Sequence, residues 1–125
     1  MKLLDTSVAV DHLRGHTAAT ELIADLLETG EELLSSELVR FELFAGVRPR
    51  EVAALETFFR AIVWLPVTED VAREAGTLAR KYRRSHTNID DVDYLIASTA
   101  LIVGCDVLTT NVRHFPMLPR LQAPY

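Results

Sequence analysis

The sequence predicts an α/β fold, in which a central parallel sheet is covered by helices on both faces. The first observation is that short apolar or β-branched runs alternate with longer segments whose apolar residues recur at a helical period. The second is that strands joined through helices run parallel, and parallel sheets need cover on both faces. The chain has 125 residues, 49% of them apolar, and no linker or repeat divides it. We therefore expect a single domain, residues 1–125, with a buried core.

The first half of the chain contains two predicted strands, each followed by helical segments. Apolar runs and the helical period predict strands at residues 2–5 and 32–35, and helices at 8–13, 17–28 and 36–45. Gly15 and Gly30 follow the first two helices, and glycine is the usual residue just after a helix end. Ser36 can cap the third helix, because its hydroxyl can accept a hydrogen bond from the first turn.

The second half repeats this alternation. Pro49 suits the first turn of a helix that continues to Phe59, and Thr68 is a candidate cap for the next helix, which continues to Tyr82. Gly104 is placed to end the last helix. Strands are predicted at residues 62–65 and 106–110, before an irregular, proline-rich tail.

The last predicted helix combines an acidic start with a long uncharged run. Asp90, Asp91 and Asp93 lie at its start, and no charge occurs from Tyr94 to Cys105, a run too short to span a bilayer. Asp90 and Asp91 are explained as helix caps. Asp93 shares a helix face with three small residues, Ala97, Ala100 and Gly104. A carboxylate at the edge of a buried face must be paired or bound to a cation, so Asp93 is a candidate site residue.

Glu42 is a second acid in an unexpected position. In the helix over residues 36–45, Leu38, Phe41 and Ala45 are expected to form the inward stripe, and Glu42 falls inside it. Glu37 and Arg40 are expected to point to the opposite side. A buried ion pair would explain Glu42, but a break in an apolar pattern is also typical of a functional site.

Asp5 is the third candidate, at the carboxyl end of the first strand. Ligands of open α/β sheets bind outside such ends, although Asp5 could instead cap the following helix. Three carboxylates brought together repel one another unless protons or a cation neutralise them. Oxygen ligands favour Mg²⁺ or Mn²⁺. Zinc is not expected, because Cys105 is the only cysteine and the four histidines are scattered, at positions 12, 16, 86 and 114.

The overall charge restricts how this protein could bind a polyanion. The net charge is −5 and the pI about 5.3, so binding to nucleic acid needs a local basic patch, bound metal, or both. The dense basic cluster is Arg80, Lys81, Arg83 and Arg84, which could equally be a solvated helix end. With one cysteine and no signal peptide at its start, the chain is expected in the cytoplasm.

Several segments of the sequence resemble the PIN-domain family, and within it the VapC toxins of bacterial toxin–antitoxin pairs. They are LLDTSV near the start, ELVRFELFAGV in the middle, and DYLIASTAL and LTTNVRHF near the end. The resemblance implies a three-layer α/β/α sandwich and a ribonuclease that depends on Mg²⁺ or Mn²⁺ and acts on transfer or ribosomal RNA. Asp5, Glu42 and Asp93 match the acids of the family, and they are the same three residues that the sequence pattern selects.

The resemblance departs at a fourth position, where family members often carry another acid. Asn111 and His114 are the candidates here, and Asp90, Thr6 and Ser7 are expected to support the site. The resemblance also implies a VapB-type antitoxin, and the apolar surface near Phe44 and Val47 suggests binding of that antitoxin or a homodimer. The alternatives are a phosphatase or DNA nuclease with the same metal site, or a nucleic-acid-binding module that has lost its catalytic activity.

Overall fold

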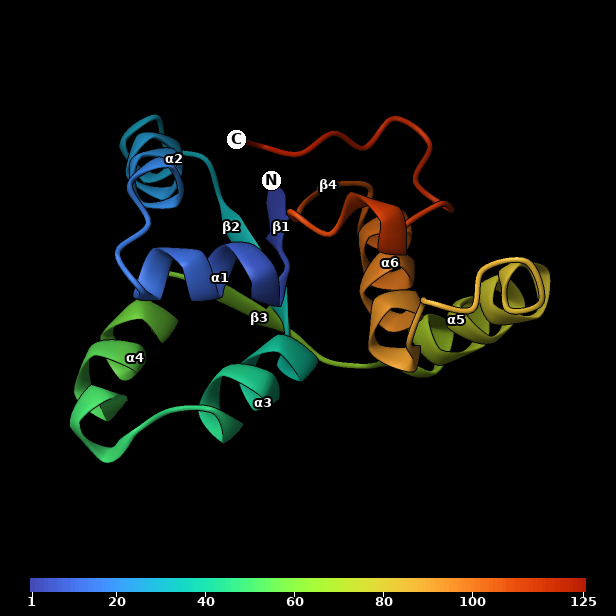
Figure 1. Ribbon diagram of the computed structural model, residues 1–125, viewed down its shortest axis with the longest axis horizontal. Helices are drawn as coiled ribbons and strands as arrows, with labels where there is room; N and C mark the ends of the chain where they lie inside the picture. Colours follow the sequence, from blue (N-terminus) through green and yellow to red (C-terminus); the bar gives the residue numbers. More distant parts are fainter.

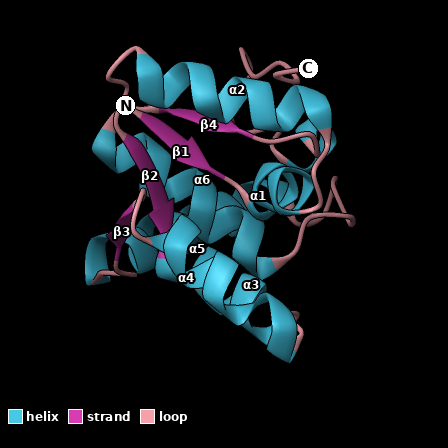
Figure 2. Cartoon of the chain, turned by 90° about the vertical axis from the view of Figure 1, so that its left-hand side faces the viewer, coloured by secondary structure: helices cyan, strands magenta, loops and turns pink.

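The structure is a computed structural model that describes all residues from 1 to 125, and it contains one four-stranded parallel sheet. The strands are β1 (Lys2–Leu4), β2 (Leu33–Ser36), β3 (Val63–Leu65) and β4 (Asp106–Leu108). Their order in the sheet is β3-β2-β1-β4, and all three neighbouring pairs are parallel (Figure 2). The predicted fold class is therefore confirmed.

Six α-helices cover the sheet and produce a three-layer α/β/α sandwich. They are α1 (Thr6–Leu13), α2 (Thr17–Glu28), α3 (Glu37–Ala45), α4 (Val52–Phe59), α5 (Glu69–Tyr82) and α6 (Asp91–Val103), with 3₁₀ turns η1 (Pro49–Glu51) and η2 (Val112–His114). Helices α1 to α4 lie on one side and the packed pair α5 and α6 on the other (Figure 1). None of these helices is long and apolar enough to cross a membrane.

The core extends over both faces of the sheet and includes buried residues of all six helices. Leu3 and Leu4 of β1 are fully buried, as are Ile96 and Ala97 of α6. Helix α6 packs against α5, and its uncharged sequence is explained by this burial on most sides. It ends at Gly104, whose φ of 78° lies in the left-handed region that glycine adopts without strain.

Helix α3 differs from its prediction in the face that it buries. Val39 and Leu43 point into the core, whereas Phe41 is 69% exposed and Glu42 is also exposed. Arg40 is half-buried, with its guanidinium 4.4 Å from the centre of the Trp64 ring. The expected inward stripe was wrong because this short helix carries two apolar stripes, and packing against the sheet selects the narrower one.

The strand order determines where a ligand can approach. From β1 the chain moves through α1 and α2 to β2 on one side, whereas β4 lies on the other side of β1. The connections therefore diverge at the carboxyl ends of β1 and β4. A crevice outside the strands at such a switch point is the usual ligand site of an open α/β sheet.

Candidate functional site

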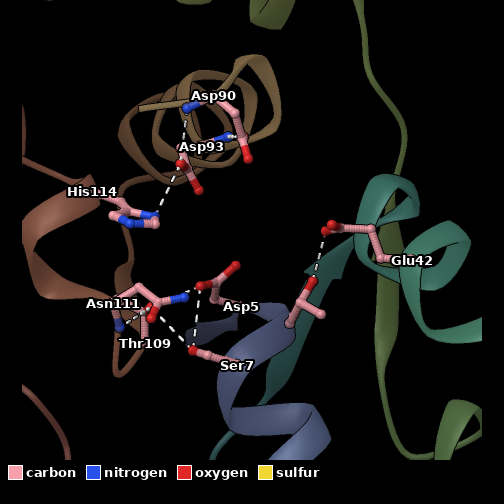
Figure 3. Close-up of polar contacts among 9 residues, drawn as sticks. Asp5, Ser7, Glu42, Asp90, Asp93, Thr109, Asn111 and His114 are labelled. Carbon is pink, nitrogen blue, oxygen red and sulfur yellow. Dashed lines mark hydrogen bonds and ion pairs between the residues drawn. The ribbon is translucent and has the colours of Figure 1, made fainter. Parts of the chain in front are cut away.

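A pocket of about 320 Å³ opens at this switch point. It is lined by Asp5, Thr6, Ser7, Val10, Asp11, Glu42, Asp90, Val92, Asp93, Thr110, Asn111 and His114. The structure thus brings together the three predicted acids and all five residues predicted to support them. They come from the end of β1, α1, α3, the start of α6 and the segment after β4 (Figure 3).

Asp5 occupies the helix-cap position of α1, but its side chain does not cap the helix. Instead, the Thr109 hydroxyl donates a hydrogen bond of 2.7 Å to Asp5 Oδ2, and Ser7 Oγ lies 3.4 Å from the same oxygen. The carboxylate is only 4% exposed. Burial raises the pKa of Asp5, and the hydrogen bonds from Thr109, the Thr6 backbone and Ser7 oppose this rise. The alternative interpretation of Asp5 as a simple helix cap is therefore wrong.

The segment after β4 forms a hydroxyl network that the sequence analysis missed. The Thr109 hydroxyl is fully buried and accepts a hydrogen bond of 3.0 Å from the Asn111 backbone N–H. Ser7 Oγ lies 3.2 Å from Thr109 Oγ1 and accepts a hydrogen bond from the Thr110 backbone N–H. These bonds tie α1 to β4 beside Asp5 (Figure 3). Thr109 follows directly after β4, but the predicted strand continued to Thr110, so the sequence pattern did not place Thr109 at a strand end.

Asp93 helps to cap the start of α6. It forms a capping box with Asp90: Asp90 Oδ1 accepts from the Asp93 N–H at 3.0 Å, and Asp93 Oδ2 accepts from the Asp90 N–H at 3.2 Å. Helix capping therefore accounts for one oxygen of the Asp93 carboxylate, for which the sequence required a partner or a cation. The second carboxylate oxygen of Asp93, Oδ1, accepts no hydrogen bond from the protein.

The pKa of Asp93 depends first on burial and then on its charged and polar neighbours, which include His114. His114 Nδ1 lies 3.3 Å from Asp93 Oδ2. Burial raises the pKa of Asp93 to about 6, and the neighbouring carboxylates of Asp90 and Asp5 add to the rise, whereas the Asp90 backbone N–H and His114 oppose it. An acid with such a pKa is costly to ionise without a cation nearby.

Glu42 approaches the pocket from α3, on the opposite side from Asp93 (Figure 3). It is exposed, and its Oε1 accepts a hydrogen bond of 2.8 Å from the Thr6 hydroxyl. Its side chain is therefore held by one contact only. The buried ion pair considered for Glu42 does not occur, because no cation pairs with it.

The three carboxylates are the type of ligand that a hard divalent cation prefers, but their side chains are not positioned around a single ion. Three carboxylates from three elements line one pocket, and oxygen ligands of this kind suit Mg²⁺ or Mn²⁺. As the chain stands, however, no group of three His, Cys, Asp or Glu side chains is arranged to hold one ion. The raised pKa values of Asp5 and Asp93 show that ionising these buried carboxyls costs free energy, and a bound cation would reduce that cost. Glu42, with its single hydrogen bond, is the acid that can most readily turn toward the other two.

The basic cluster of Arg80, Lys81, Arg83 and Arg84 lies outside this pocket. None of the four lines it, and in Figure 1 the end of α5 lies away from α1 and α3. Arg83 pairs with the exposed carboxylate of Asp91 at 2.9 Å. The cluster is linked to the site by the short segment that leads to Asp90 and by the ion pair of Arg83 with Asp91 at the start of α6.

Comparison with known proteins agrees with this arrangement. The family model of the PIN domain matches residues 2–120. The chain is 67% identical to ribonuclease VapC19 of Mycobacterium tuberculosis over 125 residues, which cover the whole of both chains. It is 41% identical to ribonuclease VapC10 of the same organism over 128 residues, covering 100% of this chain and 93% of the relative.

Solved structures share the fold. VapBC2 from Rickettsia felis, bound to a DNA fragment from its promoter, superimposes with a TM-score of 0.81 at 22% identity and covers 98% of this chain and 96% of its own. The DNA-bound VapBC from Salmonella typhimurium has a TM-score of 0.80 at 23% identity, with 98% and 95% covered. The match to the family model and the full-length identity to two relatives decide the assignment. The chain belongs to the PIN-domain family and is of the VapC type.

Proposed function

We propose that this protein is the toxin of a VapBC-type toxin–antitoxin pair, a divalent-metal-dependent endoribonuclease that cleaves transfer or ribosomal RNA in the cytoplasm. The observation that carries the proposal is the pocket at the switch point, where Asp5, Glu42 and Asp93 line one space. The full-length relatives named as ribonucleases support the same activity.

In this mechanism Asp5, Glu42 and Asp93 would hold Mg²⁺ or Mn²⁺. Such an ion would make a bound water more acidic and would stabilise negative charge on the phosphate. Thr109 orients Asp5 by donating to Oδ2, and this hydrogen bond opposes the rise in the pKa of Asp5 that burial causes. His114 lies against Asp93 Oδ2, which leaves Oδ1 available to the pocket. Water attacking in line with the P–O3′ bond would break that bond and release the 3′-oxygen as a hydroxyl, so the expected products carry a 3′-hydroxyl and a 5′-phosphate, as the family resemblance suggests.

A substrate panel tests the proposal. Transfer RNA, a ribosomal RNA fragment, single-stranded DNA and a phosphate monoester would each be incubated with the protein in Mg²⁺, in Mn²⁺ and in EDTA. The proposal predicts cleavage of RNA only, and only with metal. Cleavage of DNA would indicate a DNA nuclease, and hydrolysis of the monoester alone would indicate a phosphatase. RNA binding without cleavage would indicate a catalytically inactive module.

Thr109→Val is expected to lower the rate constant for cleavage by roughly tenfold, because the isosteric side chain no longer donates to Asp5 and leaves a buried carboxylate without its shortest hydrogen bond. The same change should cost about 1–3 kcal/mol of unfolding free energy. Thr109→Ser retains the hydroxyl and is the matched control, expected to stay close to wild type in rate. If Val and Ser variants cleave equally fast, the hydroxyl does not position Asp5.

The proposed antitoxin should silence the enzyme by placing a cation among the three carboxylates. An arginine can pair with carboxylates bidentately and replace the charge of a metal ion. On α3, which is the helix that carries Glu42, the side chains of Phe44 and Phe41 are exposed and provide apolar surface, whereas Val47 just after the helix is half-buried. We expect the saturated complex to remain inactive across a Mg²⁺ series, as measured by cleavage of labelled RNA. Full activity of that complex would contradict this mode of inhibition.

The same apolar face of α3 supports the proposed homodimer. Patches of this kind are usually interfaces, and a symmetric dimer is the commonest assembly. Light scattering of the toxin alone, and then with antitoxin, separates the two uses of this face. A monomeric toxin that binds antitoxin would assign the face to the antitoxin.

A further inference from the structure

A second pocket of about 540 Å³ adjoins the carboxylate pocket. The two pockets share Val10 and Glu42 in their linings, so they lie next to each other along α1 and α3, and we call the pair the groove. The carboxylate pocket holds Asp5 and Asp93. The second pocket extends past Glu42 between α1, α3 and α4, and we call it the arginine arm of the groove.

The arginine arm is defined by three cations from two distant parts of the sequence. Arg14 follows α1, whereas Arg48 and Arg50 lie in the segment between α3 and α4. All three are exposed, and none forms an ion pair with a carboxylate. The nearby Glu51 uses its carboxylate to accept a hydrogen bond of 2.9 Å from the Arg48 backbone N–H. The arm therefore offers three guanidinium groups without protein partners.

The charge of the groove changes along its length in a way that suits a nucleic-acid strand. At one end the three acids line the pocket proposed to take a cation, and at the other the arginines are free to bind anions. A strand whose scissile phosphate meets metal at the acidic end would place neighbouring phosphates over the arginines. Guanidinium groups recognise phosphate bidentately. An acidic peptide would gain the same contacts, but it would meet Asp5 and Asp93 at the other end without a cation of its own.

The dense cluster at the end of α5 is less well placed for this role. It lines neither pocket, and Arg83 is already paired with Asp91. That cluster stands out in the sequence because four cations occur within five residues, and it was predicted to be either an RNA-binding patch or a solvated helix end. In the arm, Arg14 lies far from Arg48 and Arg50 in the chain, and the packing of α1 against α3 and of α3 against α4 brings them to one pocket.

We infer that Arg14, Arg48 and Arg50 bind backbone phosphates of the RNA on one side of the scissile bond. This inference rests on the proposed ribonuclease function and specifies which surface holds the substrate. The arginines act on binding and not on the chemical step, so their loss should raise KM and leave kcat nearly unchanged. Since each phosphate contact adds to the salt dependence of binding, their loss should also make that dependence shallower.

The test compares two triple variants with the same change of net charge. The first replaces Arg14, Arg48 and Arg50 by Gln, and the second replaces Arg80, Lys81 and Arg84 by Gln. For the first we expect KM for RNA to rise roughly tenfold or more, and the slope of log affinity against log salt to fall by up to about 2. The second should change both quantities less. Circular dichroism and thermal melts check that each variant folds. If the first triple variant does not fold, Arg14→Gln alone replaces it in the comparison.

Binding is measured separately from cleavage so that the two proposals can fail independently. Fluorescence anisotropy of labelled RNA with the Asp93→Asn protein, with and without the arginine substitutions, reports the surface even if no substrate is cleaved. An active enzyme whose KM and salt slope are the same with and without the arginines would overturn the inference alone. Equal losses in the two triple variants, or loss of antitoxin binding with RNA affinity intact, would overturn it as well. Absence of RNA cleavage by the wild type in the substrate panel would instead contradict the proposed function.

Discussion

Asp93→Asn is expected to lower RNA cleavage by roughly a hundredfold or more while the protein remains folded. Asn is isosteric and its amide oxygen can still accept the hydrogen bond from the Asp90 N–H, so the capping box at the start of α6 is largely kept. The substitution removes the negative charge that a divalent cation requires. Single-turnover cleavage of labelled RNA at saturating Mg²⁺ measures the effect on the chemical step.

Asp91→Asn is the matched control for this experiment. Asp91 lies two residues away in the same helical turn, but its carboxylate is exposed, pairs with Arg83 and does not line the pocket. We expect this variant to cleave within a fewfold of wild type. If both variants lose activity equally, the effect comes from the start of α6 as a whole and Asp93 has no special role.

The second large effect concerns stability without metal. The pKa of Asp93 is raised from 3.8 to about 6 in the folded protein, so the folded state binds this proton more tightly than the unfolded state. The resulting stabilisation is fully present below the unfolded value and is lost as the pH rises through about 6. In EDTA at neutral pH, Asp93→Asn should therefore be more stable than wild type by about 1–2 kcal/mol. Thermal melts over a pH series test this.

The pH dependence gives this prediction its control. Near pH 5 or below the advantage of Asp93→Asn should shrink, because the wild-type carboxyl is then largely protonated. Burial also lowers the pKa of His12, so His12 makes the folded protein more stable as the pH rises. Both proteins contain His12, so its contribution cancels in the difference between their stabilities. Glu42→Gln should have a smaller effect, since Glu42 is exposed. If Asp93→Asn melts below wild type at every pH, Asp93 is mainly a structural partner of Asp90 and His114.

Metal should reverse this order of stability. Adding Mg²⁺ or Mn²⁺ is expected to raise the melting temperature of the wild type, because a ligand that binds only the folded state stabilises it by mass action. Asp93→Asn should respond much less, since it lacks one of the three carboxylates. The variant that is more stable in EDTA would thus become the less stable one at saturating metal.

The sequence predicted the fold well where the determinants are local. Helix α2 has the predicted bounds, Thr17–Glu28, and the hydroxyls of Ser36 and Thr68 accept hydrogen bonds from the first turns of α3 and α5 as expected. Gly104 ends α6 in the left-handed conformation. These features depend on a few neighbouring residues, so the sequence pattern contains them. The parallel sheet then follows from the alternation of strands and helices.

Prediction was less successful where tertiary packing decides. Helix α3 has two possible inward faces, and only contact with the sheet makes Val39 and Leu43 the buried ones. Glu42 was predicted as a site residue from its place in the expected inward stripe, yet it is exposed and reaches the pocket from the other side of the helix. The residue lines the predicted site, but its place in an inward stripe was wrong. The last strand is shorter than expected, and Thr109 leaves it to contact Asp5.

The acids of the candidate site could be predicted from the sequence, but the hydroxyl network and the arginines around them could not. Asp5 lies at a strand end and Asp93 at the start of a helix, positions that the sequence marks. The hydroxyl network of Thr109 and Ser7 depends on a contact between residues 102 apart in the chain, which no local pattern reveals. The arginine arm has the same origin. Long-range contacts of this kind come only from the three-dimensional arrangement.

The most direct test of the central claim is anomalous diffraction from crystals of the wild-type protein soaked in Mn²⁺. The claim is that Asp5, Glu42 and Asp93 together hold a divalent cation. It predicts an anomalous peak in the carboxylate pocket, with oxygens of Asp5 and Asp93 at about 2 Å and the Glu42 side chain turned from Thr6 toward the ion or its waters. No peak at saturating Mn²⁺, or a peak that none of the three carboxylates contacts, would contradict the claim.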